Sequence, residues 1–496
     1  MSTINELLRA ADADSVALFD VDGVFLTYEA LRQTVDSLAE SLRSRGVGPG
    51  DRVAIVLPNG PEMAIMFLAV VSVGCAAPLN PKYREAEFRF YLEDLGAKAL
   101  VVPPGGHPDA ERAAGSEILR LTAEGTMGGL RIDAGGTAGR LPNAAPEEGS
   151  VALVLHTSGT TSRPKVVPLR QRNLAASARN VAASLELGPA DRSLNVMPLF
   201  HIHGLVAGLL APLSAGGSVV CTPGFDPFRF HGWLESLAPT FYTSVPAIHQ
   251  LVLQRAPQPR PLALRFVRSS SSALPTRVHD DLRALFEVPV IEAYGMTEAS
   301  HQMTSNPLPP LPAKPGSVGK ATGIDVAVLD AVAGARLLPG DTGEVCVRGT
   351  TIVDGYENNE EANRASFTDA GWFRTGDEGF LDQDGYLFLT GRIKEQINRG
   401  GEKVSPLEVD EVLMSHPDVA QAVAFALSDP VLGEEVGAAV VLREGRALTE
   451  AEVRRHASTR LAAFKVPRRV FFVDEIPKGP TGKVQRIGLA KTLGVE

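Results

Sequence analysis

Residues 156–165 read His156-Thr157-Ser158-Gly159-Thr160-Thr161-Ser162-Arg163-Pro164-Lys165, a hydroxyl-rich loop that directly follows the apolar run 151–155. The apolar run predicts a buried strand, so the loop is expected at the end of that strand. Hydroxyl groups, backbone N–H groups and one lysine can together surround several phosphate oxygens, and Gly159 lets the backbone approach a ligand closely. The stretch therefore predicts a phosphate-binding loop for a nucleoside triphosphate.

A Walker A loop is the obvious alternative, because Gly159 and Lys165 have the spacing of its glycine and lysine. That motif also needs glycine before the lysine, and serine or threonine after it to hold magnesium. Here Pro164 precedes the lysine and lacks an N–H, while Val166 follows it and lacks a hydroxyl. This chemistry disfavours a kinase or a GTPase. An ordinary surface loop rich in serine and threonine remains the other alternative.

Length and composition restrict the class of protein. A chain of 496 residues exceeds what one hydrophobic core supports, and predicts roughly two to four domains. Its 44% hydrophobic and 21% charged residues are typical of a globular protein and exclude a chain dominated by disorder. The formal net charge of -10 argues against a nucleic-acid partner, so Arg163 and Lys165 are interpreted as local anion ligands. We expect small-molecule partners and a monomer or homodimer.

The cysteines and the apolar segments indicate a cellular compartment. Cys75, Cys221 and Cys346 are far apart and odd in number, which fits neither a disulfide framework nor a zinc site. Residues 63–79 are the one segment long enough to raise the question of a membrane span. They contain Ser72, Gly74 and Pro78, and a buried helix is the better interpretation. We expect a cytoplasmic protein without a membrane span.

The order of apolar runs predicts the fold class. Short runs that alternate with helical patterns indicate βαβ units and mostly parallel sheets, and they lie at 53–57, 99–102, 151–155, 218–221, 266–268 and 288–291. Residues 124–149 are rich in glycine and alanine and are expected to form a surface excursion. From Val326 onward, shorter strands with turn signals predict a more antiparallel, barrel-like part. From about Glu395 to the end, two helical patterns and short strands predict a separate lid.

Three further motifs supply groups that complement the loop. Residues 294–298, Tyr-Gly-Met-Thr-Glu, place an aromatic ring, a hydroxyl and a carboxylate after a predicted strand, where α/β sheets bind ligands. Thr375-Gly376-Asp377 supplies a carboxylate suited to a ribose diol, and Arg392 follows it. Residues 480–483, Pro-Thr-Gly-Lys, put a lysine on a tight turn. Each motif alone is weak, because each also occurs as an ordinary turn.

Together, in this order and spacing, the motifs resemble the adenylate-forming superfamily of acyl-CoA synthetases, luciferases and peptide-synthetase adenylation domains. The resemblance covers nearly the whole chain. It implies an α/β acyl-CoA synthetase fold with an N-terminal AMP-binding domain at 1–391, a hinge at 392–394 that includes Lys394, and a small mobile α+β C-terminal domain at 395–496. It also implies two half-reactions, in which a carboxylate and ATP give acyl-AMP and pyrophosphate, and a thiol then displaces AMP.

The resemblance assigns roles by position, with ATP, Mg²⁺ and coenzyme A as the expected cofactor and co-substrates. It implies an ATP- and AMP-binding set of Thr157, Ser158, Gly159, Thr160, Thr161, Lys165, Tyr294, Gly295, Thr297, Asp377, Arg392 and Lys483. It implies a catalytic set of Lys483, Thr297, Glu298 and His201, with Glu298 also as the metal ligand.

Coenzyme A is expected against Arg399, Gly400 and Gly401, for which a simple hairpin turn is the alternative interpretation. One departure concerns Val166, because the superfamily usually has glycine after the loop lysine. That difference is expected to affect the motion of the loop rather than its identity.

Polar residues indicate the class of acid. Residues 269–272 are four consecutive serines and His301 follows the 294–298 motif, whereas synthetases for fatty or aromatic acids resemble one another in having apolar acyl pockets. Within the superfamily the chain most resembles the oxalate-CoA ligases, through residues 156–165, 198–204, 298–301, 305–309 and 397–403. That resemblance places the second carboxylate of oxalate near His201, Ser271 and His301.

Physical chemistry supports such a site, because oxalate offers almost no apolar surface and must be held by charge-assisted hydrogen bonds. Several alternatives stay open. The acid could be malonate or another short acid, His201 could be a general active-site residue without a role in selection, and His301 could lie on a helix surface. Besides an oxalate-CoA ligase and a synthetase for another small acid, the chain could be a non-catalytic ATP-binding protein. The presence of Lys483, Glu298 and Asp377 disfavours this third hypothesis.

Overall fold

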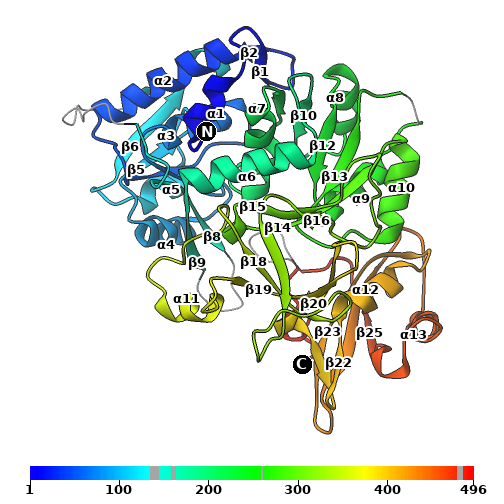
Figure 1. The fold of residues 1–496 in the computed structure, drawn as a ribbon. Coiled ribbons are helices and arrows are strands. Elements are labelled where there is room, and N and C mark those ends of the chain that lie inside the picture. Colours follow the sequence, from blue (N-terminus) through cyan, green and yellow to red (C-terminus); the bar gives the residue numbers. More distant parts are fainter. Residues whose placement is uncertain (134–144, 158–163, 259–260, 478–483) are drawn as a thin grey trace.

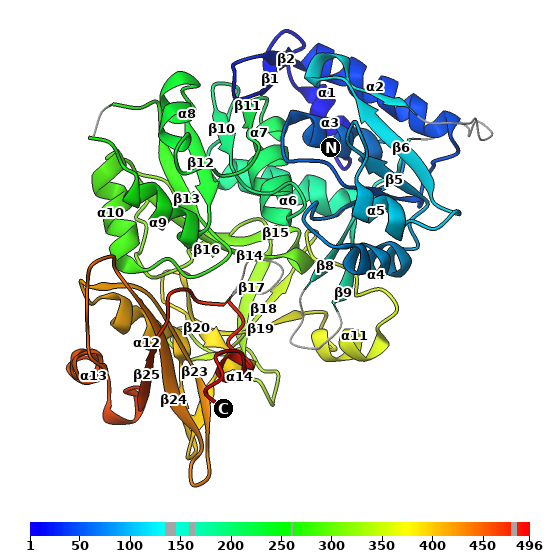
Figure 2. The ribbon, with the colours of Figure 1, turned by 180° about the vertical axis from the view of Figure 1, so that it is seen from behind.

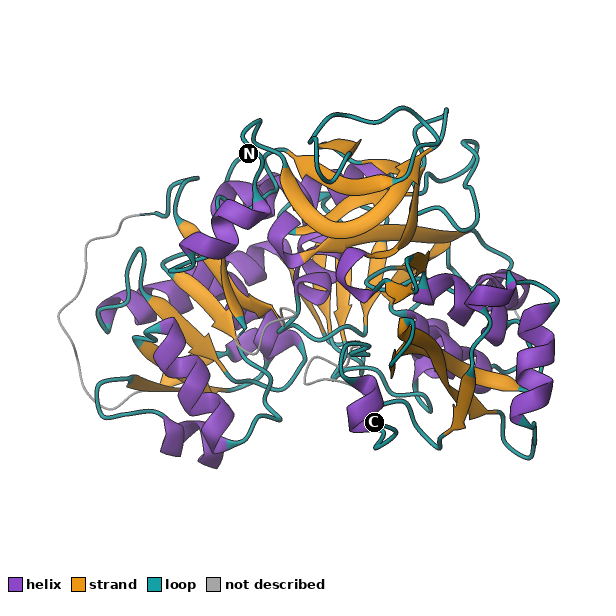
Figure 3. Cartoon of the chain, turned by 90° about the horizontal axis from the view of Figure 1, so that it is seen from below, coloured by secondary structure: helices purple, strands orange, loops and turns teal. Residues whose placement is uncertain are grey.

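The computed structural model describes residues 1–133, 145–157, 164–258, 261–477 and 484–496. Two large sheets form the bulk of the molecule, and the segments after residue 395 lie together at one end of it (Figures 1 and 2). Helices pack on both sides of the strands, as the view from below shows (Figure 3). The predicted α/β fold with a large N-terminal part and a small C-terminal part is confirmed.

The seven-stranded sheet contains the strand that precedes the phosphate-binding loop. Its order is β7 (Arg131–Asp133), β6 (Leu119–Glu124), β5 (Ala99–Val102), β3 (Arg52–Ile55), β4 (Cys75–Pro78), β8 (Val151–Thr157) and β9 (Lys165–Arg170). The inner strands are parallel, and β7 and β9 are added antiparallel at the two edges. The loop therefore connects the two strands of a hairpin.

The nine-stranded sheet carries the remaining predicted parallel strands. Its order is β16 (Lys320–Ala321), β15 (His301–Ser305), β14 (Val290–Met296), β13 (Phe266–Ser269), β12 (Phe241–Ser244), β10 (Arg192–Asn195), β11 (Ser218–Cys221), β1 (Val16–Phe19) and β2 (Phe25–Thr27). Strands β14, β13, β12, β10, β11 and β1 are parallel neighbours, whereas β15, β16 and β2 pair antiparallel. Every apolar run that predicted a strand lies on or overlaps one.

Helices fill the space between and around these sheets. They are α1 (Ile4–Ala10), α2 (Tyr28–Ser44), α3 (Pro61–Val71), α4 (Glu85–Leu95), α5 (Pro108–Ala113), α6 (Gln171–Ser184), α7 (Ala211–Ser214), α8 (Phe230–Ser236), α9 (Pro246–Gln254), α10 (Thr276–Phe286) and α11 (Glu360–Ser366). Helices α3 and α6 each contact both large sheets. One continuous hydrophobic core therefore joins the two sheets.

The segment 63–79 differs from the single buried helix that its composition predicts. Helix α3 is buried on all sides, ends at Val71, and is followed by strand β4. Gly74 permits this transition, because a Cβ atom there would lie 2.8 Å from the carbonyl oxygen of Asp51. A helix that is apolar all round is buried in a core when it is this short. None of the helices in the described part of the chain is long and apolar enough to cross a membrane.

Two further expectations need correction. Residues 124–133 belong in part to the sheet, because β7 pairs with β6, while 134–144 lie outside the described residues. The antiparallel part after Val326 is an open sheet in the order β17 (Asp325–Leu329), β18 (Gly343–Arg348), β19 (Phe373–Leu381) and β20 (Leu387–Arg392), not a closed barrel.

The C-terminal part has its own sheet and its own hydrophobic clusters. Its sheet contains β22 (Glu402–Val404), β21 (Ile397–Arg399), β24 (Gly433–Leu442) and β23 (Val419–Asp429), with β25 (Arg469–Phe472) on β24. Its helices are α12 (Pro406–Met414), α13 (Glu450–Ser458) and α14 (Leu489–Thr492). The expectation of short strands is wrong for β23 and β24, which have 11 and 10 residues. Both faces of this ribbon are covered, so long apolar strands are stable there.

Glu292 gives the fold a testable pH dependence. Burial on β14 raises the pKa of its carboxyl group to about 7, against backbone hydrogen bonds that favour the charged form. A carboxyl group whose pKa is raised on folding stabilises the protein at low pH. That stabilisation is lost as the pH rises from the ordinary value of 4.5 through about 7.

We expect Glu292→Gln to match the wild type at pH 4 and to exceed its unfolding free energy at pH 8 by about 2–4 kcal/mol. Thermal unfolding at the two pH values measures the difference. Glu287→Gln, at an exposed position in the turn before β14, is the matched control. An identical pH profile for Glu292→Gln and the wild type would contradict the prediction.

Candidate active site

The carboxyl ends of three parallel strands gather the polar residues that the sequence singles out. Ser244 of β12 is aligned with Ser269 of β13, which is aligned with Glu292 of β14. The residues that follow each strand therefore emerge at the same edge of the sheet. Ligands of open α/β sheets bind at this edge.

Three predicted nucleotide-binding residues lie in contact. The Tyr294 hydroxyl donates a hydrogen bond to the Asp377 carboxylate, and Arg392 Nε lies 3.1 Å from the other carboxylate oxygen. Asp377 and Arg392 are directly paired across β19 and β20. The adjacent carboxylate raises the pKa of Arg392. The Asp377 side chain is thus fixed by two partners at the edge where a nucleoside is expected.

A second group joins the phosphate-binding loop to the predicted metal ligand. The Nζ atom of Lys165 lies 4.3 Å from the ring centroid of Tyr356, and the Tyr356 hydroxyl donates a 2.8 Å hydrogen bond to Glu298 Oε1. Burial lowers the pKa of Lys165, while the negative charge of Glu298 opposes that shift. The sequence motifs did not identify Tyr356, because nothing in its local pattern distinguishes it from a loop residue.

The donor set around Glu298 fits one role for magnesium. Mg²⁺ is usually held by one or two carboxylates together with substrate phosphates and water. Within the described ranges, no group of three or more His, Cys, Asp or Glu residues could hold a metal ion. A single buried carboxylate beside the loop lysine therefore suits an ion that arrives with a triphosphate.

The loop itself is described only at its base. Thr157 ends β8 and pairs with Lys165, the first residue of β9. Five predicted positions lie outside the described residues: Ser158, Gly159, Thr160, Thr161 and Lys483. Val166 pairs with His156 and is buried in the cluster that covers one face of the seven-stranded sheet. This departure from the usual glycine places a β-branched side chain in a strand, where it packs well.

The 294–298 motif ends in a strained turn. Thr297 begins a short 3₁₀ turn, η3 (Thr297–Ala299), after which Ser300 and His301 have φ values of 54° and 103°. Gly295 is required sterically, because a Cβ atom there would lie 1.7 Å from the carbonyl oxygen of His301. Residues held at positive φ cluster at functional sites.

A buried polar cluster lies at the same edge. His203 is on the π-helix η2 (His203–Leu210), and its Nδ1 lies 3.1 Å from Ser271 Oγ while its Nε2 lies 2.7 Å from Thr243 Oγ1. The rings of His203 and His301 stack with centroids 4.8 Å apart. Arg268 faces a ring nitrogen of each histidine, with Nη2 3.2 Å from His301 Nε2 and Nη1 3.5 Å from His203 Nε2.

Burial, with the nearby histidine rings and the charge of Arg268, holds the pKa of His203 well below its ordinary value, so its ring is neutral. His201 lies close enough to contribute to that shift, and its ring packs against Phe200. His301 begins β15 and is buried, so the alternative that places it on a helix surface is wrong.

Sequence reasoning identified Ser271, His201 and His301, and it missed His203 and Arg268. The signal for Arg268 was present, since a charged residue ended an apolar run that predicted a buried strand. His203 lay within a quoted segment, but only the topology distinguishes it from His201.

The glycine pair of the C-terminal part forms a hairpin turn. Gly400 and Gly401 connect β21 to β22 with φ values of 59° and 95°, a conformation that strongly favours glycine. Arg399, at the end of β21, pairs with Glu435. Lys394 lies in the short turn η4 (Ile393–Glu395), and its charge lowers the pKa of Lys165. The hairpin geometry is compatible with the predicted coenzyme A contact and does not require it.

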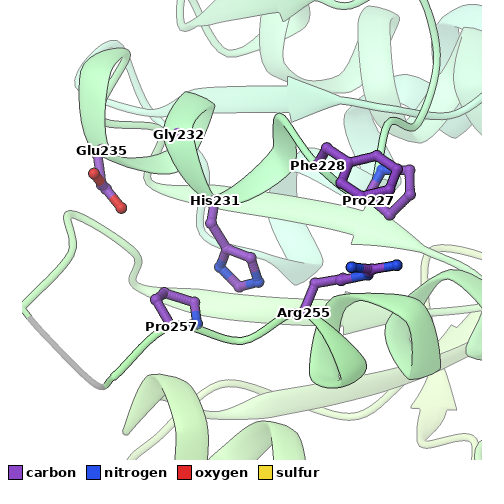
Figure 4. A pocket seen from close by; sticks show the side chains of 7 residues that line it. All are labelled: Pro227, Phe228, His231, Gly232, Glu235, Arg255 and Pro257. Atoms are coloured by element: carbon purple, nitrogen blue, oxygen red, sulfur yellow. The ribbon is translucent and has the colours of Figure 1, made fainter.

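A surface pocket elsewhere contains none of the predicted site residues. It lies at α8 and α9 (Figure 4) and is lined by Pro227, Phe228, His231, Gly232, Glu235, Arg255 and Pro257. The candidate site therefore rests on the convergence of motifs at the sheet edge.

The chain is similar to known proteins over most of its length. Residues 8–357 match the AMP-binding enzyme family, and residues 408–483 match its C-terminal domain. An oxalate–CoA ligase of Arabidopsis thaliana is 47% identical over 94% of this chain and 93% of its own. A sulfoacetate–CoA ligase of Cupriavidus necator is 37% identical over 94% of this chain and 92% of its own.

Solved structures add information about conformation. ATP-bound MatB from Rhodopseudomonas palustris is 30% identical, with a TM-score of 0.89 over 99% of this chain and 98% of its own. The apo form of the same protein, at the same coverage, gives 0.79. The arrangement of the chain is therefore closer to the ATP-bound form.

The chain belongs to the AMP-binding enzyme family, the adenylate-forming enzymes that its motifs resemble. More particularly, it is an ATP-dependent, AMP-forming acid–CoA ligase, a class that uses ATP, Mg²⁺ and coenzyme A.

The Tyr356–Glu298 contact leads to a prediction about magnesium. Tyr356→Phe keeps the ring below Lys165 and removes the hydrogen bond to Glu298. With Glu298 as the metal ligand, we expect the Mg²⁺ concentration for half-maximal acyl-AMP formation to rise about tenfold, because a hydrogen bond to a charged group is lost. Pyrophosphate release at varied Mg²⁺ measures the change.

Tyr386→Phe is the matched control for this experiment. Tyr386 also lies against lysines, Lys314 and Lys320, and also donates a hydrogen bond through its hydroxyl, to a backbone carbonyl outside the candidate site. Its Mg²⁺ dependence should equal that of the wild type. The same result for Tyr356→Phe would remove Tyr356 from the proposed metal site.

Proposed function

We propose that the enzyme is an oxalate–CoA ligase, which activates oxalate as oxalyl-AMP and transfers the oxalyl group to coenzyme A. The observation that carries the proposal is the buried polar cluster of His203, Ser271, Arg268 and His301 at the carboxyl edge of the nine-stranded sheet. A site for a fatty or aromatic acid would need apolar surface instead. The Arabidopsis relative that acts on oxalate supports the same acid.

The acid is held, in this proposal, by donors rather than by packing. Its reacting carboxylate faces the α-phosphate of ATP, and its second carboxylate lies near His201, Ser271 and His301. Hydrogen bonds to a charged group are roughly twice as strong as neutral ones, which compensates for the small apolar surface of oxalate. The buried His301, at the end of the site, limits the length of the acid.

Acyl-AMP forms when an oxygen of the acid bonds to the α-phosphorus and the bond to pyrophosphate breaks. Negative charge builds on the phosphate oxygens, and we assign its neutralisation to Lys165 and Lys483. Thr297 is assigned to the α-phosphate, and the loop positions to the β- and γ-phosphates: Thr157, Ser158, Gly159, Thr160 and Thr161. Glu298 would hold Mg²⁺, which supplies further positive charge when it is bound.

The nucleoside is assigned to the Tyr294–Asp377–Arg392 group. Asp377 accepts hydrogen bonds from the ribose hydroxyls, Arg392 pairs with that carboxylate, and the Tyr294 ring lies beside the adenine with Gly295. The contact of the three side chains supports this assignment.

Thioester formation is proposed to need a second arrangement of two domains, 1–391 and 395–496, about the hinge 392–394. Rotation at Lys394 moves Lys483 away and brings the turn of Arg399, Gly400 and Gly401 to the acyl-AMP, where the thiol displaces AMP. The better agreement with the ATP-bound relative supports the present arrangement as that of the first half-reaction.

The acid assignment predicts an order of substrates. We expect kcat/KM for oxalate to exceed that for malonate or acetate at least about tenfold, because acetate leaves buried donors unpaired and malonate places its carboxylate one methylene too far. Pyrophosphate release with these acids and with sulfoacetate measures it. A preference for malonate, another short acid or sulfoacetate would overturn the assignment to oxalate and leave the ligase class standing.

The two half-reactions should separate by variant. Lys483→Ala should slow acyl-AMP formation about 10²- to 10³-fold while thiol transfer from supplied acyl-AMP is retained.

Lys394→Pro restricts φ at the hinge, so acyl-AMP should form while thioester formation stalls. Lys491→Ala, at an exposed position on α14, is the control. If one of these variants lost both half-reactions equally, the lysine that it replaces would be a structural residue.

A further inference from the structure

Arg268 is a fully buried arginine without a carboxylate partner. It lies on β13, its side chain is 0% exposed, and none of the ion pairs among the described residues includes it. Burial lowers its pKa to about 9, which still leaves the guanidinium charged at neutral pH. A buried charge is costly unless an opposite charge or several hydrogen bonds compensate for it. Its position therefore calls for a function.

The hydrogen-bond partners of Arg268 are all neutral. Nη1 donates to Thr243 Oγ1 at 2.9 Å, and Nη2 donates to Gln302 Oε1 at 2.8 Å and faces His301 Nε2 at 3.2 Å. Its Nε has no partner, and neither do the hydroxyls of the adjacent Ser269 and Ser270. The positive charge of Arg268 is thus stabilised only by neutral polar side chains. Within the described residues, no carboxylate neutralises it.

A guanidinium group can only donate hydrogen bonds. The donors of Arg268 therefore fix which atom donates in each hydrogen bond of the neighbouring side chains. His301 Nε2 must accept, so the proton of that neutral ring is on Nδ1. Thr243 Oγ1 accepts from Arg268 and gives its own proton to His203 Nε2, which also faces Arg268 Nη1 at 3.5 Å. His203 Nδ1–H then donates to Ser271 Oγ.

The hydrogen-bond chain ends at the sheet edge. Ser271 follows β13, is half-buried, and has a φ of 74°, an uncommon conformation for serine. Because its oxygen accepts from His203, its hydroxyl proton is available to donate onward. The Arg268–Thr243–His203–Ser271 chain, which we name the acyl relay, therefore presents a donor at the edge where the acid is proposed to bind.

We propose that Arg268 is a positioning residue that sets the acyl relay and His301 as hydrogen-bond donors and supplies a fixed positive charge beneath the acyl site. The site then selects an acid that carries a second anionic group over an acid of the same size with a neutral group. This inference rests on the proposed function and goes beyond it, because it assigns the selection to a residue that does not touch the acid.

The test compares oxalate with oxamate, in which an amide replaces the second carboxylate at nearly the same size. Arg268→Met removes the charge and keeps an unbranched side chain. We expect kcat/KM for oxalate to fall about 10- to 100-fold, mostly through KM, and the oxalate-to-oxamate ratio to fall by a similar factor. Oxamate is measured as a substrate, and as a competitive inhibitor of oxalate where it is not turned over.

Two further variants separate positioning from general damage to the fold. Arg268→Lys keeps the charge and should recover part of the preference for oxalate. Thr243→Val removes only the hydroxyl that accepts a hydrogen bond from Arg268 and donates one to His203. It should raise KM for oxalate several-fold without changing KM for ATP. This variant decides the question if Arg268→Met fails to fold.

Arg192→Met is the matched control, because Arg192 is a partly buried arginine of the same nine-stranded sheet and lies outside the acyl relay. It should affect both acids equally. An equal loss for both acids in Arg268→Met, or a wild-type enzyme that does not distinguish oxalate from oxamate, would overturn the inference. A wild type that prefers sulfoacetate would overturn the proposed function alone, and the charge of Arg268 would then be tested with that acid and a neutral analogue.

Discussion

The parallel pairing of β12, β13 and β14 is the constraint on which the site depends. Their register aligns Ser244, Ser269 and Glu292, so that the residues that follow each strand emerge at one edge. A shift of one residue would turn alternate side chains to the opposite face of the sheet. Arg268 would then leave the layer that contains His203 and His301, and the polar cluster could not form. The apolar strand interiors that fix this register therefore also fix the proposed acyl site.

Burial of polar groups at this edge has a cost that the surrounding network only partly offsets. Arg268 has hydrogen bonds on both terminal nitrogens but none on Nε, and the hydroxyls of Ser269 and Ser270 lack partners as well. Unsatisfied buried groups typically cost about 1–3 kcal/mol each. A site that keeps such groups gives up stability for electrostatic preorganisation, since its donors are in place before an anion arrives.

Local sequence patterns were sufficient to predict the strands and to pick out short motifs whose residues lie together in the structure. Tyr294, Asp377 and Arg392 were identified from short motifs, and the structure brings them into contact. Tyr356 and His203 could not be identified in this way, because their partners, Glu298 and Thr243, are far away in the sequence. The open sheet after Val326 and the long strands β23 and β24 likewise depend on what covers them. The periodicity of apolar residues indicates which face of a helix or strand is buried, but it does not indicate which other elements pack against that face.

One strand connects the nucleotide site to the C-terminal part. Successive side chains of a strand point to opposite faces, so Asp377 and Glu378 of β19 face different surroundings. Asp377 contacts Tyr294 and Arg392, while Glu378 accepts hydrogen bonds from Thr390 and from Gln396, both at 3.0 Å. Gln396 directly follows the η4 turn that contains Lys394.

In the proposed function, a nucleotide that draws Asp377 toward its ribose would therefore act on the same strand segment that holds the residues after the proposed hinge. Beyond that point, Arg486 pairs with Glu395 and with the buried Asp410, which ties the C-terminal segment to the hinge and to α12. The path from Asp377 to the C-terminal sheet consists of one strand and two sets of polar contacts. Such a short connection is a physical route by which occupancy of the nucleotide site can bias the position of the C-terminal part.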